Sequence, residues 1–144
     1  MSPARGAEAA ALAREWLGTP FCHRASLRGA GADCLGLLRG VWRGLYGCEA
    51  EAVPPYGQDW AESGAGAALR DALLRHLRPK PVAEAAVGDV LLFRLLRRGP
   101  AKHVGIQTGP AQFVHAHAGH GVIEVPLNEP WRRRIVARFA FPPV

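Results

Sequence analysis

Cysteine is scarce in this chain of 144 residues, and the positions of its three cysteines argue against a disulfide framework and against a zinc site. Cys22, Cys34 and Cys48 leave one thiol over in any disulfide pairing, and no two of them have the CxxC spacing of a zinc site. A bond between Cys22 and Cys48 stays open, although nothing else indicates an oxidising compartment. We therefore expect free thiols.

Long apolar runs and targeting patterns are also missing. No stretch approaches the roughly 20 apolar residues that a membrane-spanning helix needs. Residues 1–8 lack the charged and then apolar segments of a secretory signal peptide. The sequence therefore predicts synthesis in the cytoplasm without a signal peptide, and no membrane span.

Acidic residues are fewer than basic ones: 12 aspartates and glutamates stand against 18 lysines and arginines, which gives a formal charge of +6. This excess favours encounters with anionic partners. Nucleic acid is disfavoured as that partner, because the arginines are not interleaved with aromatics and no recognition motif is present. Without repeats or a linker, a chain of this length suits one core, and we expect a single domain over residues 1–144.

The order of periodic segments predicts the fold class. Helical spacing of apolar residues comes first, and the predicted helices cover residues 3–18, 34–47 and 63–77, the third capped by Ser63. From residue 88 the spacing becomes that of strands, predicted at residues 90–95, 102–107, 112–117, 121–125 and 134–141. Helices followed by strands indicate an α+β domain, in which the helix that starts at Cys34 packs on a five-stranded antiparallel sheet.

Cys34 stands at the start of the second predicted helix, and Asp33 separates it from the glycine-rich run 28–32. The N–H groups of a first helical turn lack partners and carry roughly half a positive charge, which stabilises a thiolate and can hold an oxyanion. Cys34 is therefore a candidate nucleophile, and a buried structural cysteine is the alternative. Asp33 has the residue type of an N-cap, a role that we favour over direct catalysis.

Two histidines follow on strands that flank a turn signal at residues 108–110. A hairpin centred on Gly109 places His103 directly opposite His115, where opposed Cβ atoms lie about 4.5–5.5 Å apart. His115 can then hold one ring nitrogen of His103 while the other faces Cys34. His115, His117 and His120 with His103 could alternatively form a metal cluster, but no acidic or thiolate ligand joins them in sequence, and we expect no metal.

Four separated segments resemble, in order, the NlpC/P60 superfamily of cysteine peptidases: residues 16–21, 31–37, 103–106 and 113–116. The resemblance extends from about Leu12 to Pro142. Within the superfamily the chain is most similar to cell-wall peptidases encoded with the tail genes of phages and of phage-like gene transfer agents. Residues 39–43 and 129–134 carry this closer resemblance.

The resemblance implies a papain-like arrangement and a thiol protease that cuts peptidoglycan. It implies Cys34 as nucleophile, His103 as general base, His115 as orienting residue, and no cofactor. The implied target is an amide bond of the stem peptide, such as γ-D-glutamyl to diaminopimelate. The implied partners are that peptide and the tail hub or tail-tip proteins of a phage-like particle, a virion from which the enzyme acts in the periplasm of the target cell.

The chain departs from the family at two positions, and two other functions stay open. His23 stands where many members have a tyrosine, and Leu35 where many have a serine directly after the cysteine. We expect His23 and Asp33 to support substrate binding or the oxyanion, the latter together with the Cys34 backbone N–H. The alternatives are a structural tail component with reduced or dispensable activity, and a thiol acyltransferase.

Overall fold

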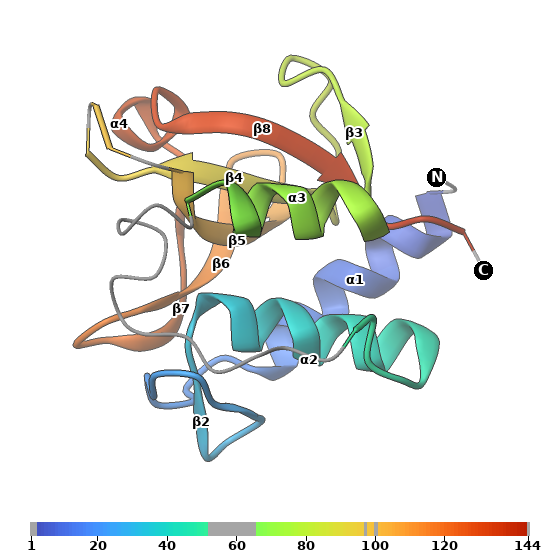
Figure 1. The fold of residues 1–144 in the computed structure, drawn as a ribbon. Helices are drawn as coiled ribbons and strands as arrows, with labels where there is room; N and C mark the ends of the chain where they lie inside the picture. Colours follow the sequence, from blue (N-terminus) through green and yellow to red (C-terminus); the bar gives the residue numbers. More distant parts are fainter. Residues whose placement is uncertain (1–2, 52–65, 97, 100, 144) are drawn as a thin grey trace.

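The structure is a computed structural model that describes residues 3–51, 66–96, 98–99 and 101–143 (Figure 1). The predicted cap Ser63 lies outside the described residues. The helices are α1 (Pro3–Glu15), α2 (Cys34–Tyr46), α3 (Gly66–His76) and α4 (Glu129–Arg132). The strands are β1 (Ser26–Leu27), β2 (Gly31–Ala32), β3 (Arg78–Lys80), β4 (Val90–Arg94), β5 (Ala101–Gly109), β6 (Gln112–His117), β7 (Gly121–Pro126) and β8 (Ile135–Ala140).

Helix α2 begins and ends where its capping residues require. The side chain of Asp33 accepts a hydrogen bond from the backbone N–H of Gly36 at 2.7 Å, so Asp33 is the N-cap. Gly47 closes the helix in the left-handed region, with φ of 81°, and donates its N–H to the Arg43 carbonyl oxygen at 2.8 Å. These two caps fix Cys34 as the first residue of the helix.

The main sheet has six antiparallel strands in the order β3-β8-β4-β5-β6-β7, and it confirms the predicted α+β class. The predicted number of five strands is wrong, because β3 adds to the edge beside β8. Pro79 lies within β3 and pairs with Phe139. A proline is compatible with an edge strand, where its missing N–H costs no ladder bond, and in the sequence the same proline indicated only the end of a helix.

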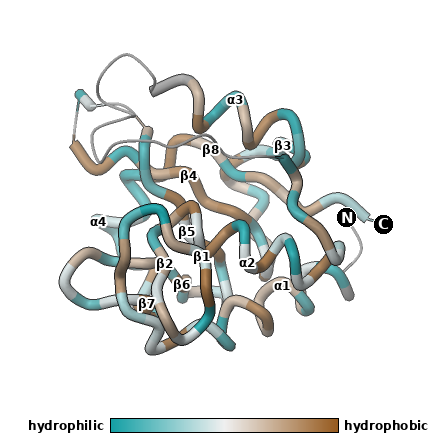
Figure 2. The backbone as a smooth tube through the Cα atoms, turned by 60° about the horizontal axis from the view of Figure 1, so that its bottom comes forward, coloured by the Kyte–Doolittle hydropathy of each residue, from teal (hydrophilic) through white to brown (hydrophobic). Residues whose placement is uncertain are grey.

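Both faces of the sheet are covered. Val90 and Leu92 of β4 face a large core shared with α1, α2 and α3, while Leu91 and Phe93 belong to a smaller core on the opposite face. Because every second residue is buried on each side, β4 reads as a continuous apolar run along the chain (Figure 2). No helix among the described residues is long and apolar enough to cross a membrane.

The register of the β5–β6 hairpin differs from the predicted one. The prediction pairs Ile106 with Gln112, whereas the structure pairs Ile106 with Val114 and has an irregularity between Gln107 and Gly109. The strands are therefore shifted by two residues, so His103 is not directly opposite His115. A shift of two residues preserves the face on which each side chain lies, so both imidazoles remain on the same side of the sheet.

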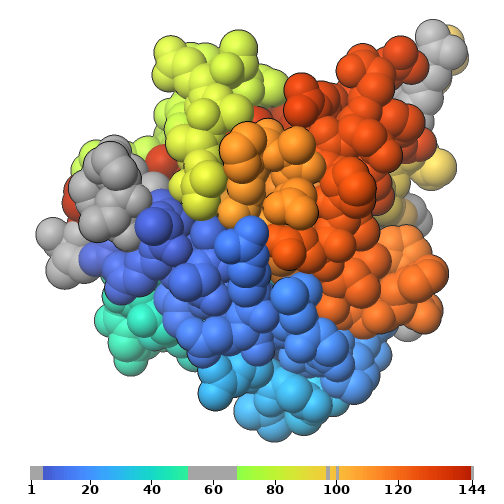
Figure 3. Space-filling view, turned by 180° about the vertical axis from the view of Figure 1, so that it is seen from behind, coloured from blue at the N-terminus to red at the C-terminus, as the bar shows by residue number. Residues whose placement is uncertain are grey.

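Helix α1 crosses the back of the sheet and closes the large core. In Figure 3 its blue segment lies against the yellow-green segment that leads into β4 and against orange strands. Two close approaches show how tight this packing is. A Cβ atom on Gly88 would lie 2.2 Å from the Gly6 carbonyl oxygen, and one on Gly40 would lie 1.9 Å from the Trp16 ring. Glycine at these positions lets α1 dock against both the β3–β4 connection and α2.

Candidate active site

The Cys34 thiol lies against the backbone on both sides of His103. Its sulfur is 3.9 Å from the Lys102 carbonyl oxygen, to which the thiol can donate. The backbone N–H groups of Val104, Leu35 and Cys34 itself also interact with the sulfur. Helix α2 thus brings the thiol to the start of β5, and the predicted nucleophile and the predicted base belong to one site.

Burial dominates the electrostatics of this thiol. Desolvation raises the pKa of Cys34 to about 11, and the neighbouring Asp33 carboxylate adds to that rise, while the three backbone N–H groups oppose it. The helix start alone therefore does not produce a thiolate. At neutral pH the resting sulfur carries its proton, and attack on a substrate requires a base that removes it.

His103 and His115 form a hydrogen-bonded pair. His103 Nε2 lies 2.7 Å from His115 Nδ1, and both side chains are buried. The contact that the sequence predicted between the two rings is present, although it is diagonal across the hairpin rather than directly opposed. Because Nε2 of His103 is bonded to His115, the other ring nitrogen of His103, Nδ1, is the atom that can accept a proton.

Both imidazoles of the pair are held neutral. The pKa of His103 is lowered to about 3, first by burial and then by positive charge on His115, His117 and Lys102. Burial likewise lowers the pKa of His115 to about 4, with His117 acting in the same direction. In a neutral pair one ring must donate. If His103 Nε2–H donates to His115 Nδ1, the Nδ1 atom of His103 is unprotonated and can act as a base.

An aromatic cluster accounts for much of this burial. The Trp131 ring lies 5.1 Å from the His115 ring and 6.2 Å from the His103 ring, and it also contacts Phe93 and Phe113. Trp131 is carried by the short helix α4, whose N-cap is Asn128. Sequence reasoning did not assign Trp131 to the site, because a four-residue helix has no periodicity to reveal which way its side chains point.

The loop before α2 brings His23 close to Asp33. His23 Nδ1 is 3.9 Å from Asp33 Oδ2, an oxygen that also accepts the backbone N–H of Arg24 at 2.8 Å. Asp33 therefore caps α2 with one oxygen and fixes the preceding loop with the other. His23 therefore lies beside Asp33, the residue that precedes Cys34. This is the location expected for a side chain that supports substrate binding or the oxyanion.

The remaining histidines of the predicted cluster extend away from the pair toward the surface. The His117 ring lies 5.6 Å from the His115 ring, and its Nδ1 is 3.1 Å from Nδ1 of the exposed His120. Among the described residues, no three histidine, cysteine, aspartate or glutamate side chains are placed to hold one metal ion. The three cysteines are free, so the open pairing of Cys22 with Cys48 is not formed.

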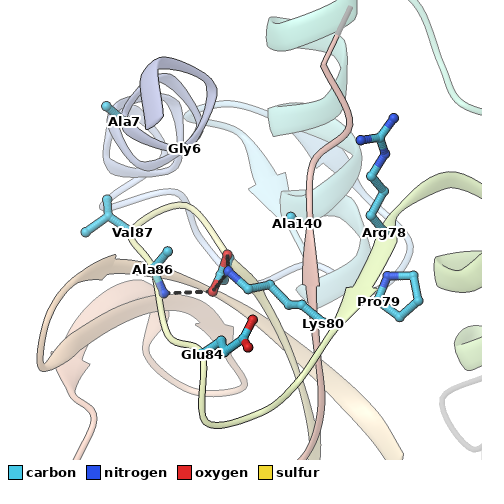
Figure 4. A pocket seen from close by; sticks show the side chains of 10 residues that line it. Gly6, Ala7, Arg78, Pro79, Lys80, Glu84, Ala86, Val87 and Ala140 are labelled. Atoms are coloured by element: carbon cyan, nitrogen blue, oxygen red, sulfur yellow. Dashed lines mark hydrogen bonds and ion pairs between the residues drawn. The ribbon is translucent and has the colours of Figure 1, made fainter. Parts of the chain in front are cut away.

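A separate pocket of about 540 Å³ lies between the first turn of α1 and the β3–β4 connection (Figure 4). Lys80 points into it toward the carboxylate of Asp89, at 3.1 Å. Asp89 is also bonded at 2.8 Å to the buried Arg138, which donates to Gln107 as well. None of the residues lining this pocket belongs to the site of Cys34 and the histidine pair, and Asp89 is paired with both Lys80 and Arg138.

Comparison with known proteins identifies the family. The NlpC/P60 family model matches residues 18–139, so the chain belongs to the NlpC/P60 family, a family of cell-wall peptidases. The murein DD-endopeptidase MepS/murein LD-carboxypeptidase of Escherichia coli K12 is 31% identical over 121 residues, which are 83% of this chain and 54% of that protein. The chain thus spans about half the length of the curated relatives it matches.

Solved structures share the fold. NlpC2 from Trichomonas vaginalis superposes with a TM-score of 0.69 at 20% identity, over 98% of this chain and 49% of that one. An NlpC/P60 family protein from Bacillus cereus gives the same TM-score at 18% identity, over 96% of this chain and 40% of that one. At these identities the likeness establishes the papain-like NlpC/P60 fold alone.

Proposed function

We propose that the protein is a peptidoglycan endopeptidase that works by Cys-His-His catalysis. The observation that carries the proposal is the hydrogen-bonded pair of His103 and His115, held at the strand against which the Cys34 thiol lies. Membership of the NlpC/P60 family supports the substrate class. The activity named for the MepS relative, cleavage of murein peptides, supports it as well.

In the proposed acylation step, His103 Nδ1 takes the thiol proton as the Cys34 sulfur attacks the scissile carbonyl carbon. The oxyanion that forms accepts a hydrogen bond from the Cys34 backbone N–H at the start of α2, with His23 as a further donor from the preceding loop. The intermediate then collapses, the carbon–nitrogen bond breaks, and the leaving amine takes the proton from His103. The products are a thioester on Cys34 and a released peptide amine.

Water completes the cycle by the reverse proton movements. His103 removes a proton from a water molecule that attacks the thioester, and it returns that proton to the departing sulfur. His115 contributes through His103, because its Nδ1 fixes the ring and stabilises the imidazolium that exists during each step. In this scheme the low pKa of His103 matters, since the ring must start neutral.

The bond that we propose is the amide between γ-D-glutamate and diaminopimelate of the stem peptide. The test is incubation of the purified protein with peptidoglycan of a Gram-negative bacterium, followed by mass spectrometry of the released muropeptides. We expect new fragments that end at D-glutamate with the wild-type protein and none with Cys34→Ala. Full hydrolysis by a folded Cys34→Ala variant would refute the mechanism, and fragments cut elsewhere would refute only the choice of bond.

We propose further that the enzyme is carried on a phage-like tail and acts on the wall in the periplasm of the target cell. The resemblance of residues 39–43 and 129–134 to tail-associated peptidases supports this, and its partners would then be tail hub or tail-tip proteins. Particles assembled with Cys34→Ala protein test the role. Normal assembly with poor delivery is expected, whereas failed assembly with a folded variant would favour a structural component.

A further inference from the structure

We propose that the guanidinium of Arg24 binds a substrate carboxylate beside the scissile amide, and so determines specificity. The inference rests on the proposed function, because it names a contact of the substrate at that same site. It starts from one backbone conformation. Arg24 has φ of 65°, and it is the one non-glycine residue with positive φ in the part of the chain that the structure describes.

This conformation is unfavourable for an arginine. In the left-handed region the Cβ atom crowds the following carbonyl oxygen, a cost that glycine avoids. Nothing about the turn itself requires a side chain, since the interaction that holds it uses the backbone N–H of Arg24, 2.8 Å from Asp33 Oδ2. A strained residue beside a catalytic group is a hypothesis of function with a physical basis.

The surrounding contacts explain how the strain is maintained. Ser26 donates its hydroxyl to the Gly36 carbonyl oxygen at 2.6 Å. Arg43 of α2 binds Ser26 twice, through the hydroxyl at 2.9 Å and through the carbonyl oxygen at 2.8 Å. These bonds fix the loop that carries Arg24 to α2, the helix that begins at Cys34.

The charge of Arg24 is available for a ligand. Other arginines of this region are already engaged, Arg28 with Glu15 and Arg43 with Ser26 and Glu49. Arg24 is exposed, and within the described ranges the structure gives its guanidinium neither a hydrogen bond nor an ion pair. Arg24 thus differs from Arg28 and Arg43 in two ways. Its backbone has an unfavourable left-handed conformation, and its guanidinium has no partner among the described residues.

The proposed substrate offers the matching group. When glutamate is linked through its γ-carboxyl, its α-carboxyl remains free on the same residue, separated from the scissile carbonyl by Cα and two methylene groups. A guanidinium binds a carboxylate through two parallel N–H bonds, which gives both affinity and orientation. The backbone of Arg24 is bonded to Asp33, the residue before Cys34, so we infer that a carboxylate held by its guanidinium would bring the scissile carbonyl to the start of α2.

The test compares two synthetic stem peptides that differ in one group. One has a free α-carboxyl on its D-glutamate, and in the other this carboxyl is amidated. Each is offered to wild type, Arg24→Gly, Arg24→Lys and the control Arg28→Gly, which removes the same charge from the same loop. The readouts are kcat/KM for each peptide and the thermal unfolding midpoint of each variant.

We expect Arg24→Gly to lower kcat/KM for the free carboxylate about 10- to 100-fold, as for loss of a charged hydrogen-bonded pair. Its unfolding midpoint should equal or exceed that of wild type, because the strain is removed. Wild type should prefer the free carboxylate, and Arg24→Gly should lose that preference. Arg24→Lys should keep part of the preference, and Arg28→Gly all of it.

The possible failures are distinguishable. If wild type cleaves neither peptide, the proposed bond and with it the role of Arg24 are wrong, and the muropeptide analysis above shows whether the protein is a peptidase that cuts another bond. If wild type cleaves both equally well, or if Arg24→Gly keeps the full preference, the enzyme stands and the role of Arg24 is refuted. A variant that loses activity and stability together would assign Arg24 a structural role instead.

Discussion

The buried histidine pair should make the protein lose stability as the pH falls below 7. The pKa of His103 is about 3 and that of His115 about 4, against 6.5 for an unperturbed imidazole. Between these values the unfolded chain binds protons that the folded chain does not. Stability is therefore present above pH 6.5 and is lost as the pH falls toward the folded pKa values.

The size of the effect follows from the same values. For a folded pKa far below 5, one imidazole contributes about 2 kcal/mol to the free energy of unfolding at pH 5 less than it does at pH 7. Two such groups together approach about 4 kcal/mol, a large fraction of the 5–15 kcal/mol of an ordinary domain. Carboxylates titrate mostly below this range.

Urea unfolding followed by tryptophan fluorescence at pH 7, 6 and 5 measures this dependence. We expect the wild-type slope to be largely absent from the double variant His103→Gln/His115→Gln and unchanged in His120→Gln, since His120 is exposed. An equal slope in the double variant would refute the argument. If that variant does not fold, imidazole NMR of wild type gives the answer, because two of the six histidines should titrate below pH 5.

Substitutions at three further positions test two contacts beside Cys34 and one buried ion pair. Asp33→Ala should cost about 1–2 kcal/mol of unfolding free energy in urea, and Asp33→Ser should restore part of it, since a serine hydroxyl can cap α2 but cannot also accept the Arg24 N–H. Asp89→Asn should cost about 3–5 kcal/mol, because it removes the charged partner of the buried Arg138, and a loss below 1 kcal/mol would contradict this. Gly36→Ala would place a Cβ atom 1.8 Å from the Ala25 carbonyl oxygen, a backbone atom that cannot move aside cheaply, so the unfolding midpoint and the rate of hydrolysis should both fall.

Local signals in the sequence were sufficient to predict the helix that carries Cys34. The residue type of Asp33 as a cap, the apolar spacing after Cys34 and the glycine at position 47 describe interactions within one helix, and the structure shows each of them. The face of His103 and His115 was also predictable, because alternation along a strand needs no knowledge of its partner. The α+β class followed from the order of these segments.

Interactions between distant segments were not predictable in the same way. The hairpin turns at residues 110–111 instead of being centred on Gly109, and with the one-residue irregularity between Gln107 and Gly109 the pairing differs by two residues from the predicted one. Strand β3 exists because β8 offers a free edge, 60 residues further along the chain. The left-handed backbone of Arg24 is likewise imposed by bonds to Asp33, since arginine has no preference for it.

The two halves of the active site differ in how they are assembled during folding. His103 and His115 meet within a single hairpin, a contact between near neighbours in sequence whose loop closure costs little entropy. Cys34 reaches them only when α2 has docked on the sheet, from about 70 residues away. The histidine pair can therefore exist in a partly folded chain, whereas hydrolysis cannot. Hydrolysis therefore requires α2 to be docked on the sheet. As the protein unfolds, hydrolysis should be lost before the hairpin itself unfolds.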